Sequence, residues 1–147
     1  MPAAYPLDLA AVLERLRALA EALPAVQAAV LGIPDSWEVQ LTAAVTLAGL
    51  TAFHAEDDVP GALQREARFL VQLGYSTDGD EGGAEVALAA AVDAFQRSAY
   101  GDEQLNYLLA SLSVDAPQAD QIEYQLFASQ EVRLYPLVVR GRQWGAY

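Results

Sequence analysis

Residues 39–47 have the sequence VQLTAAVTL, which carries a clean strand signal. Every second residue from Val39 to Leu47 is apolar, and the residues between them are polar or small. A period of two, rich in valine and threonine, is typical of a half-buried strand. The alanines leave a helix open as an alternative. Gly49 interrupts the alternation, so we expect residues 50–54 to return as a hairpin partner.

Two segments predict helices. Residues 9–23 carry apolar side chains at helical spacing, with Asp8 placed to start the helix and Pro24 to end it. Residues 84–99 repeat the pattern, and Gly101 follows as a stop.

Further strands are expected from alternating or short apolar runs at 26–31, 66–75, 108–114, 122–127 and 130–142. Pro136 has no N–H to donate to a ladder, so its strand should lie at an edge or carry a bulge. The order of elements predicts an α+β fold, with a mostly antiparallel sheet and two main helices packed on one face. With 147 residues and no linker, we expect residues 1–147 to form a single domain.

The composition excludes several classes of protein. The chain has 8 basic residues, all arginine, and 20 acidic ones, which gives a net charge of −12. A surface this acidic repels phosphate, which argues against a nucleic-acid reader and against an anionic membrane surface. The start of the chain lacks the pattern of a secretory signal, and no apolar stretch is long enough to span a membrane, so we expect assembly in a cytoplasm.

Catalytic chemistry has little to build on. There is no cysteine and a single histidine, so we predict no cofactor, no metal site and no enzyme activity. His54 with Glu56 or Asp58 is the one place where a histidine meets carboxylates. We interpret it as a solvated loop, and an enzyme or weak cation site there remains the alternative.

Arginine and aromatic residues are enriched toward the end of the chain, and these residue types anchor protein interfaces. Arginine in an acidic chain can pair with carboxylates of the next subunit, and tryptophan offers a large apolar surface. The alternative is pairing within the chain on the outer faces of strands. We predict subunit contacts through Arg65, Arg68, Arg133, Arg140 and Trp144.

Eight segments together carry a resemblance to a known family. They are LPAVQ (23–27), GIPDS (32–36), AAVTL (43–47), LQREARFLV (63–71), YSTDG (75–79), residues 84–95, EYQL (123–126) and QEVRLYPLVV (130–139). In this order, and over almost the whole chain, they resemble the tail terminator, or tail completion, proteins of long-tailed bacteriophages.

The resemblance implies a structural virion protein. Such proteins form a hexameric ring that caps the tail tube, ends tube polymerisation and joins the tail to the head-neck connector. The implied partners are other copies of the chain, the tail tube protein and the connector protein, and the implied location is the tail-neck junction of the virion. Genome DNA would pass through the lumen without specific binding, which suits an acidic surface.

Two alternatives remain. Four short segments also resemble a small helical peptidoglycan-binding module: Leu63-Gln64, Leu73-Gly74-Tyr75, Asp78-Gly79 and the run from Ala91 to Gln96. That module would need a helix over residues 69–75, where the sequence alternates, and it has no place for the last strands. The other alternative is a different neck or tail-completion subunit, or a chaperone-like adaptor.

Overall fold

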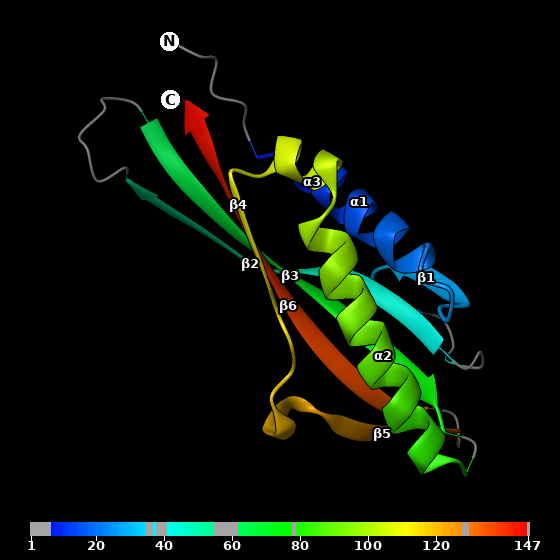
Figure 1. The fold of residues 1–147 in the computed structure, drawn as a ribbon. Helices are drawn as coiled ribbons and strands as arrows, with labels where there is room; N and C mark the ends of the chain where they lie inside the picture. The colour runs from blue at the N-terminus through cyan, green and yellow to red at the C-terminus, as the bar shows by residue number, and fades with distance from the viewer. Residues whose placement is uncertain are drawn as a thin grey trace.

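The structure is a computed structural model that describes residues 7–34, 37, 41–54, 62–77, 79–127 and 130–146, without the side chains of 52–54, 62–64 and 144–146. A six-stranded sheet carries helices on one face (Figure 1). The elements are α1 (Leu9–Glu21), β1 (Ala28–Leu31), β2 (Leu41–His54), β3 (Ala62–Ser76), α2 (Glu81–Tyr100), α3 (Glu103–Leu108), β4 (Ser111–Asp115), the 3₁₀ helix η1 (Ala119–Gln121), β5 (Glu123–Phe127) and β6 (Gln130–Ala146).

The sheet has the order β1-β2-β3-β6-β4. β5 also pairs with β6, on the same side as β4. β1 and β2 are parallel, and the other pairs are antiparallel. Apolar side chains of α1 and α2 share one core with the sheet, including Leu16, Phe69 and Phe95. The predicted α+β fold, with a mostly antiparallel sheet and two main helices on one face, is therefore confirmed.

Both main helices begin at an aspartate that caps them. The Asp8 carboxylate accepts a hydrogen bond from the N–H of Ala11 at 3.0 Å, and the Asp80 carboxylate accepts one from Gly83 at 2.9 Å. Each satisfies a backbone donor that the first turn leaves unpaired. α2 thus begins a few residues before the predicted start at residue 84.

The prediction that the strand ends near Gly49 is wrong. β2 continues to His54, and its register with β3 shifts between Leu47 and Gly49, where Ala48 is the additional residue of a β-bulge. Residues 50–54 are therefore no hairpin partner. They pair with the beginning of β3, which starts at Ala62, earlier than predicted.

The prediction for Pro136 is also wrong, because β6 lies inside the sheet. β3 pairs with one side of β6, and β5 and β4 pair with residues 130–134 and 138–142 on the other side. The N–H of Ala110 donates to the carbonyl oxygen of Arg142, so even-numbered residues of β6 direct their backbone groups away from β3. Pro136 therefore faces the gap between β5 and β4, where no donor is needed.

The predicted strand over 108–114 begins too early. Residues 103–108 form α3, capped by Asp102, whose carboxylate accepts from the N–H of Leu105 at 3.0 Å. The strand β4 starts only at Ser111.

Candidate assembly surfaces

The outer half of β2 belongs to an arm that extends past the helices. We define the arm as Gly49–His54 of β2 with Ala62–Arg68 of β3, and Figure 1 shows it at the upper left. β1 covers β2 only from Thr42 to Val45. Within the described part of the chain, no strand pairs with the outer edge of β2 beyond that point. An uncovered edge is a template for another strand.

Side chains of α2 close the outer edge of β4 at Val114. The N–H of Val114 donates to the hydroxyl oxygen of Tyr100 at 2.7 Å, and Gln96 Nε2 donates to the carbonyl oxygen of Val114 at 3.0 Å. Both outward backbone groups of Val114 are therefore satisfied inside the molecule. A helix that covers an edge in this way prevents strand addition there.

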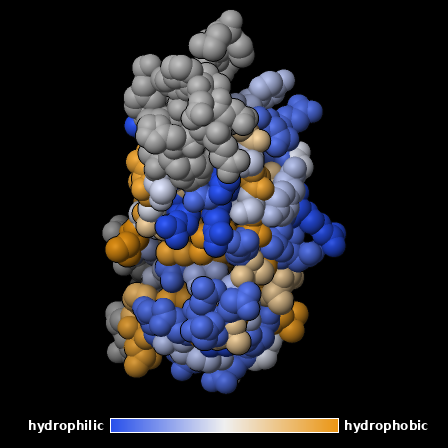
Figure 2. All heavy atoms as spheres, turned by 90° about the vertical axis from the view of Figure 1, so that its left-hand side faces the viewer, coloured by the Kyte–Doolittle hydropathy of each residue, from blue (hydrophilic) through white to orange (hydrophobic). Residues whose placement is uncertain are grey.

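β5 also presents an uncovered edge. It pairs with β6 on one side, and no strand pairs with its other side among the residues that the structure describes. Its Tyr124 and Leu126 are 42% and 74% exposed, and Leu47 and Leu50 on β2 are 44% and 50% exposed. Figure 2 shows separate hydrophobic patches between hydrophilic residues on the side that it views. A contact there would combine small apolar areas with polar groups.

Arg68 and Arg140 lie opposite each other on β3 and β6, on the face away from the helices. Arg140 Nε is 3.4 Å from Asp115 Oδ2, and Arg142 Nε is 3.3 Å from Glu66 Oε1. Arg68 is exposed, and none of the described side chains forms an ion pair with it. Like charges placed directly opposite destabilise a strand pair, so a carboxylate of another chain would be stabilised here.

Arg133 has partners inside the chain. Its Nε lies 2.6 Å from Glu85 Oε1 of α2, and its guanidinium lies 4.1 Å from the ring centre of Tyr124. The Tyr135 hydroxyl also donates to Glu85, which lowers the pKa of that carboxyl, and Arg133 lowers it further. Burial, and then the bond to Glu85, raise the pKa of Tyr135 to about 12. This cluster ties α2 to β6.

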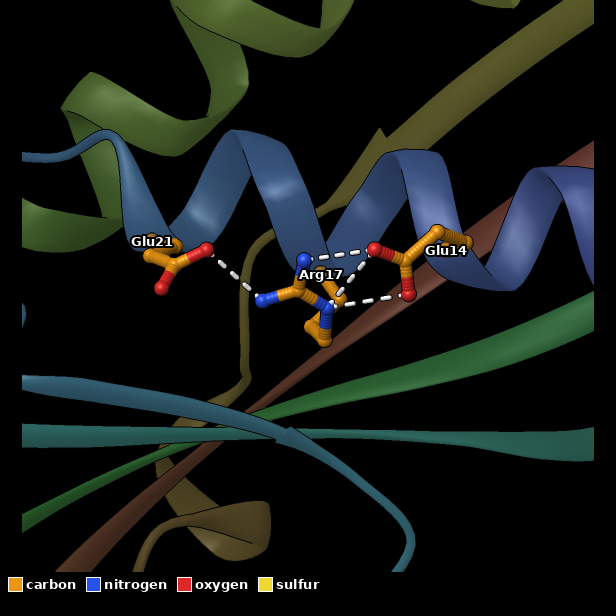
Figure 3. Close-up of polar contacts among 3 residues, drawn as sticks. All are labelled: Glu14, Arg17 and Glu21. Carbon is orange, nitrogen blue, oxygen red and sulfur yellow. Dashed lines mark hydrogen bonds and ion pairs between the residues drawn. The ribbon is translucent and has the colours of Figure 1, made fainter.

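Arginines on the helices are also engaged within the chain. Figure 3 shows Arg17 of α1 between Glu14 and Glu21, with N–O distances of 2.5 and 2.7 Å. Arg15 forms a bidentate pair with Asp102 at 2.6 and 2.9 Å, which lowers the pKa of that carboxyl.

The structure thus brings Arg68 and Arg140 together, and it places the half-buried Arg65 on the other face of β3, beside core residue Ala67. Trp144 lies in β6, and its side chain is outside the described part. The interface role of these residues stays a prediction. The alternative cluster at His54 is not described either: His54 ends β2 without a described side chain, and Glu56 and Asp58 lie outside the described residues.

Sequence reasoning missed a small second core on the face away from the helices. Trp37 packs there with Ala44, Val132 and Leu134, and its ring centre is 5.7 Å from that of Phe127. The exposed Ile33 lines the neighbouring groove of about 390 Å³. The sequence signal for this core is that Ala44, Val132 and Leu134 are apolar on the second face of their strands.

Among the described residues, no three His, Cys, Asp or Glu side chains converge as metal ligands. None of the described helices is long and apolar enough to cross a membrane. Residues 69–75 lie in β3, whereas the peptidoglycan-binding module would need a helix there.

Comparisons with known proteins show no family for this chain. No protein family model matches the sequence, and no curated protein matches it. Among solved structures, 21 chains are similar. One belongs to the virion of a native gene transfer agent (GTA) particle, with 18% identity and a TM-score of 0.41, and the match covers 88% of this chain and 84% of that chain. A likeness at this level carries no argument about function.

Proposed function

We propose that the protein is a structural subunit of a phage-like particle and, within that class, a tail terminator. The observation that carries the proposal is the uncovered edge of β2 on the projecting arm, opposite a sheet side where α2 closes β4. Unlike sides favour head-to-tail contacts, which generate rings when the rotation closes. The resemblance of eight ordered segments to tail terminators adds independent support.

In this role the chain forms a hexameric ring on the end of the tail tube at the tail-neck junction. The ring stops further addition of tube subunits and presents its other side to the head-neck connector. The net charge of −12 suits a lumen through which DNA slides, because acidic walls do not hold phosphate. The proposal gives the chain no enzyme activity and no cofactor.

The test is assembly of the purified protein, alone and with the tail tube protein of the same particle. We expect rings by negative-stain microscopy and native mass spectrometry, and tubes that stop growing once capped. His54→Ala should also assemble like the unmodified chain, because strand addition at the β2 edge uses backbone groups. A protein that stays monomeric and leaves tube length unchanged would refute the proposal, and loss of function in His54→Ala would favour the enzyme alternative.

A further inference from the structure

We propose that β5 of one copy adds as an antiparallel strand to the uncovered outer half of β2 of the next copy. The inference rests on the proposed function, and it names the surfaces through which the ring closes. Three features of the described residues carry it: strand direction, the orientation of the backbone groups, and the position of exposed apolar side chains.

Strand direction comes first. β2 is antiparallel to β3, β3 to β6, and β6 to β5, so β5 runs opposite to β2 within one copy. Neighbouring copies in a ring differ by one rotation about the ring axis. A neighbour displaced sideways along the sheet therefore presents its β5 antiparallel to β2.

The backbone of β2 presents hydrogen-bonding groups at defined residues. The N–H groups of Gln27 and Gly32 donate to the carbonyl oxygens of Leu41 and Val45, so odd-numbered residues of this half point away from β3. The bulge inserts Ala48 and reverses the alternation. Leu47 before the bulge and Leu50 after it therefore both direct their backbone groups outward.

The outward residues of β5 are Tyr124 and Leu126. The backbone groups of even-numbered β6 residues point away from β3. Val132 and Leu134 therefore form backbone hydrogen bonds with their partners Gln125 and Glu123. The backbone groups of the alternate residues, Tyr124 and Leu126, therefore point to the uncovered edge. Each edge thus offers a pair of outward residues that can exchange N–H···O bonds.

The side chains of these outward residues lie on the same face of the sheet. Leu47 and Leu50 pair with the core residues Phe69 and Ala67, so they face the helices. Tyr124 pairs with Arg133, which reaches Glu85 of α2, so Tyr124 and Leu126 face the helices as well. Strand addition would therefore keep the helices of both copies on one side, as a ring of equivalent subunits requires.

The bulge also sets the register. With Ala48 as the additional residue, Leu50 lies opposite Tyr124 when Leu47 lies opposite Leu126. All four side chains are more than 40% exposed in the single chain. Their mutual burial removes exposed apolar surface at both edges at once.

Disulfide trapping tests the inference, because the chain has no cysteine of its own. A Leu50→Cys chain is mixed with a Tyr124→Cys chain under mild oxidation, and Leu47→Cys with Leu126→Cys. Cα atoms of hydrogen-bonded partners are about 5.5 Å apart, which suits a disulfide. We expect mixed dimers in both cases. The matched control mixes Tyr107→Cys, which is 83% exposed on α3, with Leu126→Cys and should give few.

A second variant, Leu126→Lys, should weaken ring formation at least tenfold while the far-UV circular dichroism of the monomer stays unchanged. Rings without cross-links, or rings of undiminished stability in Leu126→Lys, would overturn the inference and leave the proposed function standing. Homodimers of Leu50→Cys alone would also overturn it, because they would show two β2 edges in contact. Cross-links in a protein that never forms rings would support the edge contact and refute the terminator role.

Discussion

Gly74 of β3 is the residue whose replacement has the plainest consequence. A Cβ atom at this position would lie 2.1 Å from Cζ3 of Trp37, whose ring covers the glycine. We expect Gly74→Ala to cost about 1–3 kcal/mol of unfolding free energy, because a well-packed aromatic ring must move. Chemical denaturation followed by circular dichroism measures it.

The matched test for Gly74 uses Trp37. In a Trp37→Ala background the obstructing ring is gone, so adding Gly74→Ala should cost well under 1 kcal/mol, as coupled neighbours behave in a double-mutant cycle. An equal cost in both backgrounds would mean that backbone conformation, and not the ring, requires glycine here.

At the scale of elements, Asp102 joins α3 to α1. Its carboxylate is 9% exposed, binds Arg15 and caps α3. We expect Asp102→Asn to cost about 1–3 kcal/mol through the lost ion pair, and Asp102→Ala about 1 kcal/mol more through the lost cap. Asp93→Asn, at an exposed pair with Arg97, should change the free energy of unfolding very little.

The same carboxylate predicts a pH dependence. Arg15, and the N–H of Leu105, lower its pKa in the folded state. A lowered pKa means that the stabilisation is complete above the ordinary value of 3.8 and is lost as the pH falls through the folded-state value. The free energy of unfolding, measured by chemical denaturation between pH 6 and pH 2, should therefore decrease less toward acidic pH in Asp102→Asn than in the unmodified chain.

The elements also show what a sequence can predict. α1 follows from helical spacing and its capping Asp8, α2 follows from helical spacing, and the alternation of residues 39–47 correctly predicts a strand. The sequence does not predict the bulge, because a glycine such as Gly49 suits a turn and a bulge equally. Pairing of β2 with β3 determines which of the two forms. The position of Pro136 inside the sheet is possible because of the gap between β5 and β4, which its own sequence neighbourhood does not show. Arg133 resembled an interface residue because its partner, Glu85, lies far away in the sequence.

Across the whole molecule, charge reversal at two arginines should have different effects on assembly and on folding. Arg68→Glu should not lower the unfolding free energy, since the arginine is exposed, pairs with none of the described carboxylates and lies opposite Arg140, which would attract a carboxylate there. It should weaken assembly roughly tenfold, because it adds repulsion between acidic copies. Arg133→Glu should instead destabilise the monomer, because it places a carboxylate beside Glu85. Thermal unfolding and native mass spectrometry on both variants separate the two effects.

The hydrogen bonds that Gln96 and Tyr100 make to Val114 have a consequence for growth. A sheet that could extend from every margin would polymerise into fibres. By occupying that margin from within, α2 withdraws β4 from such growth, so in the proposed ring no further chain can add beside Val114.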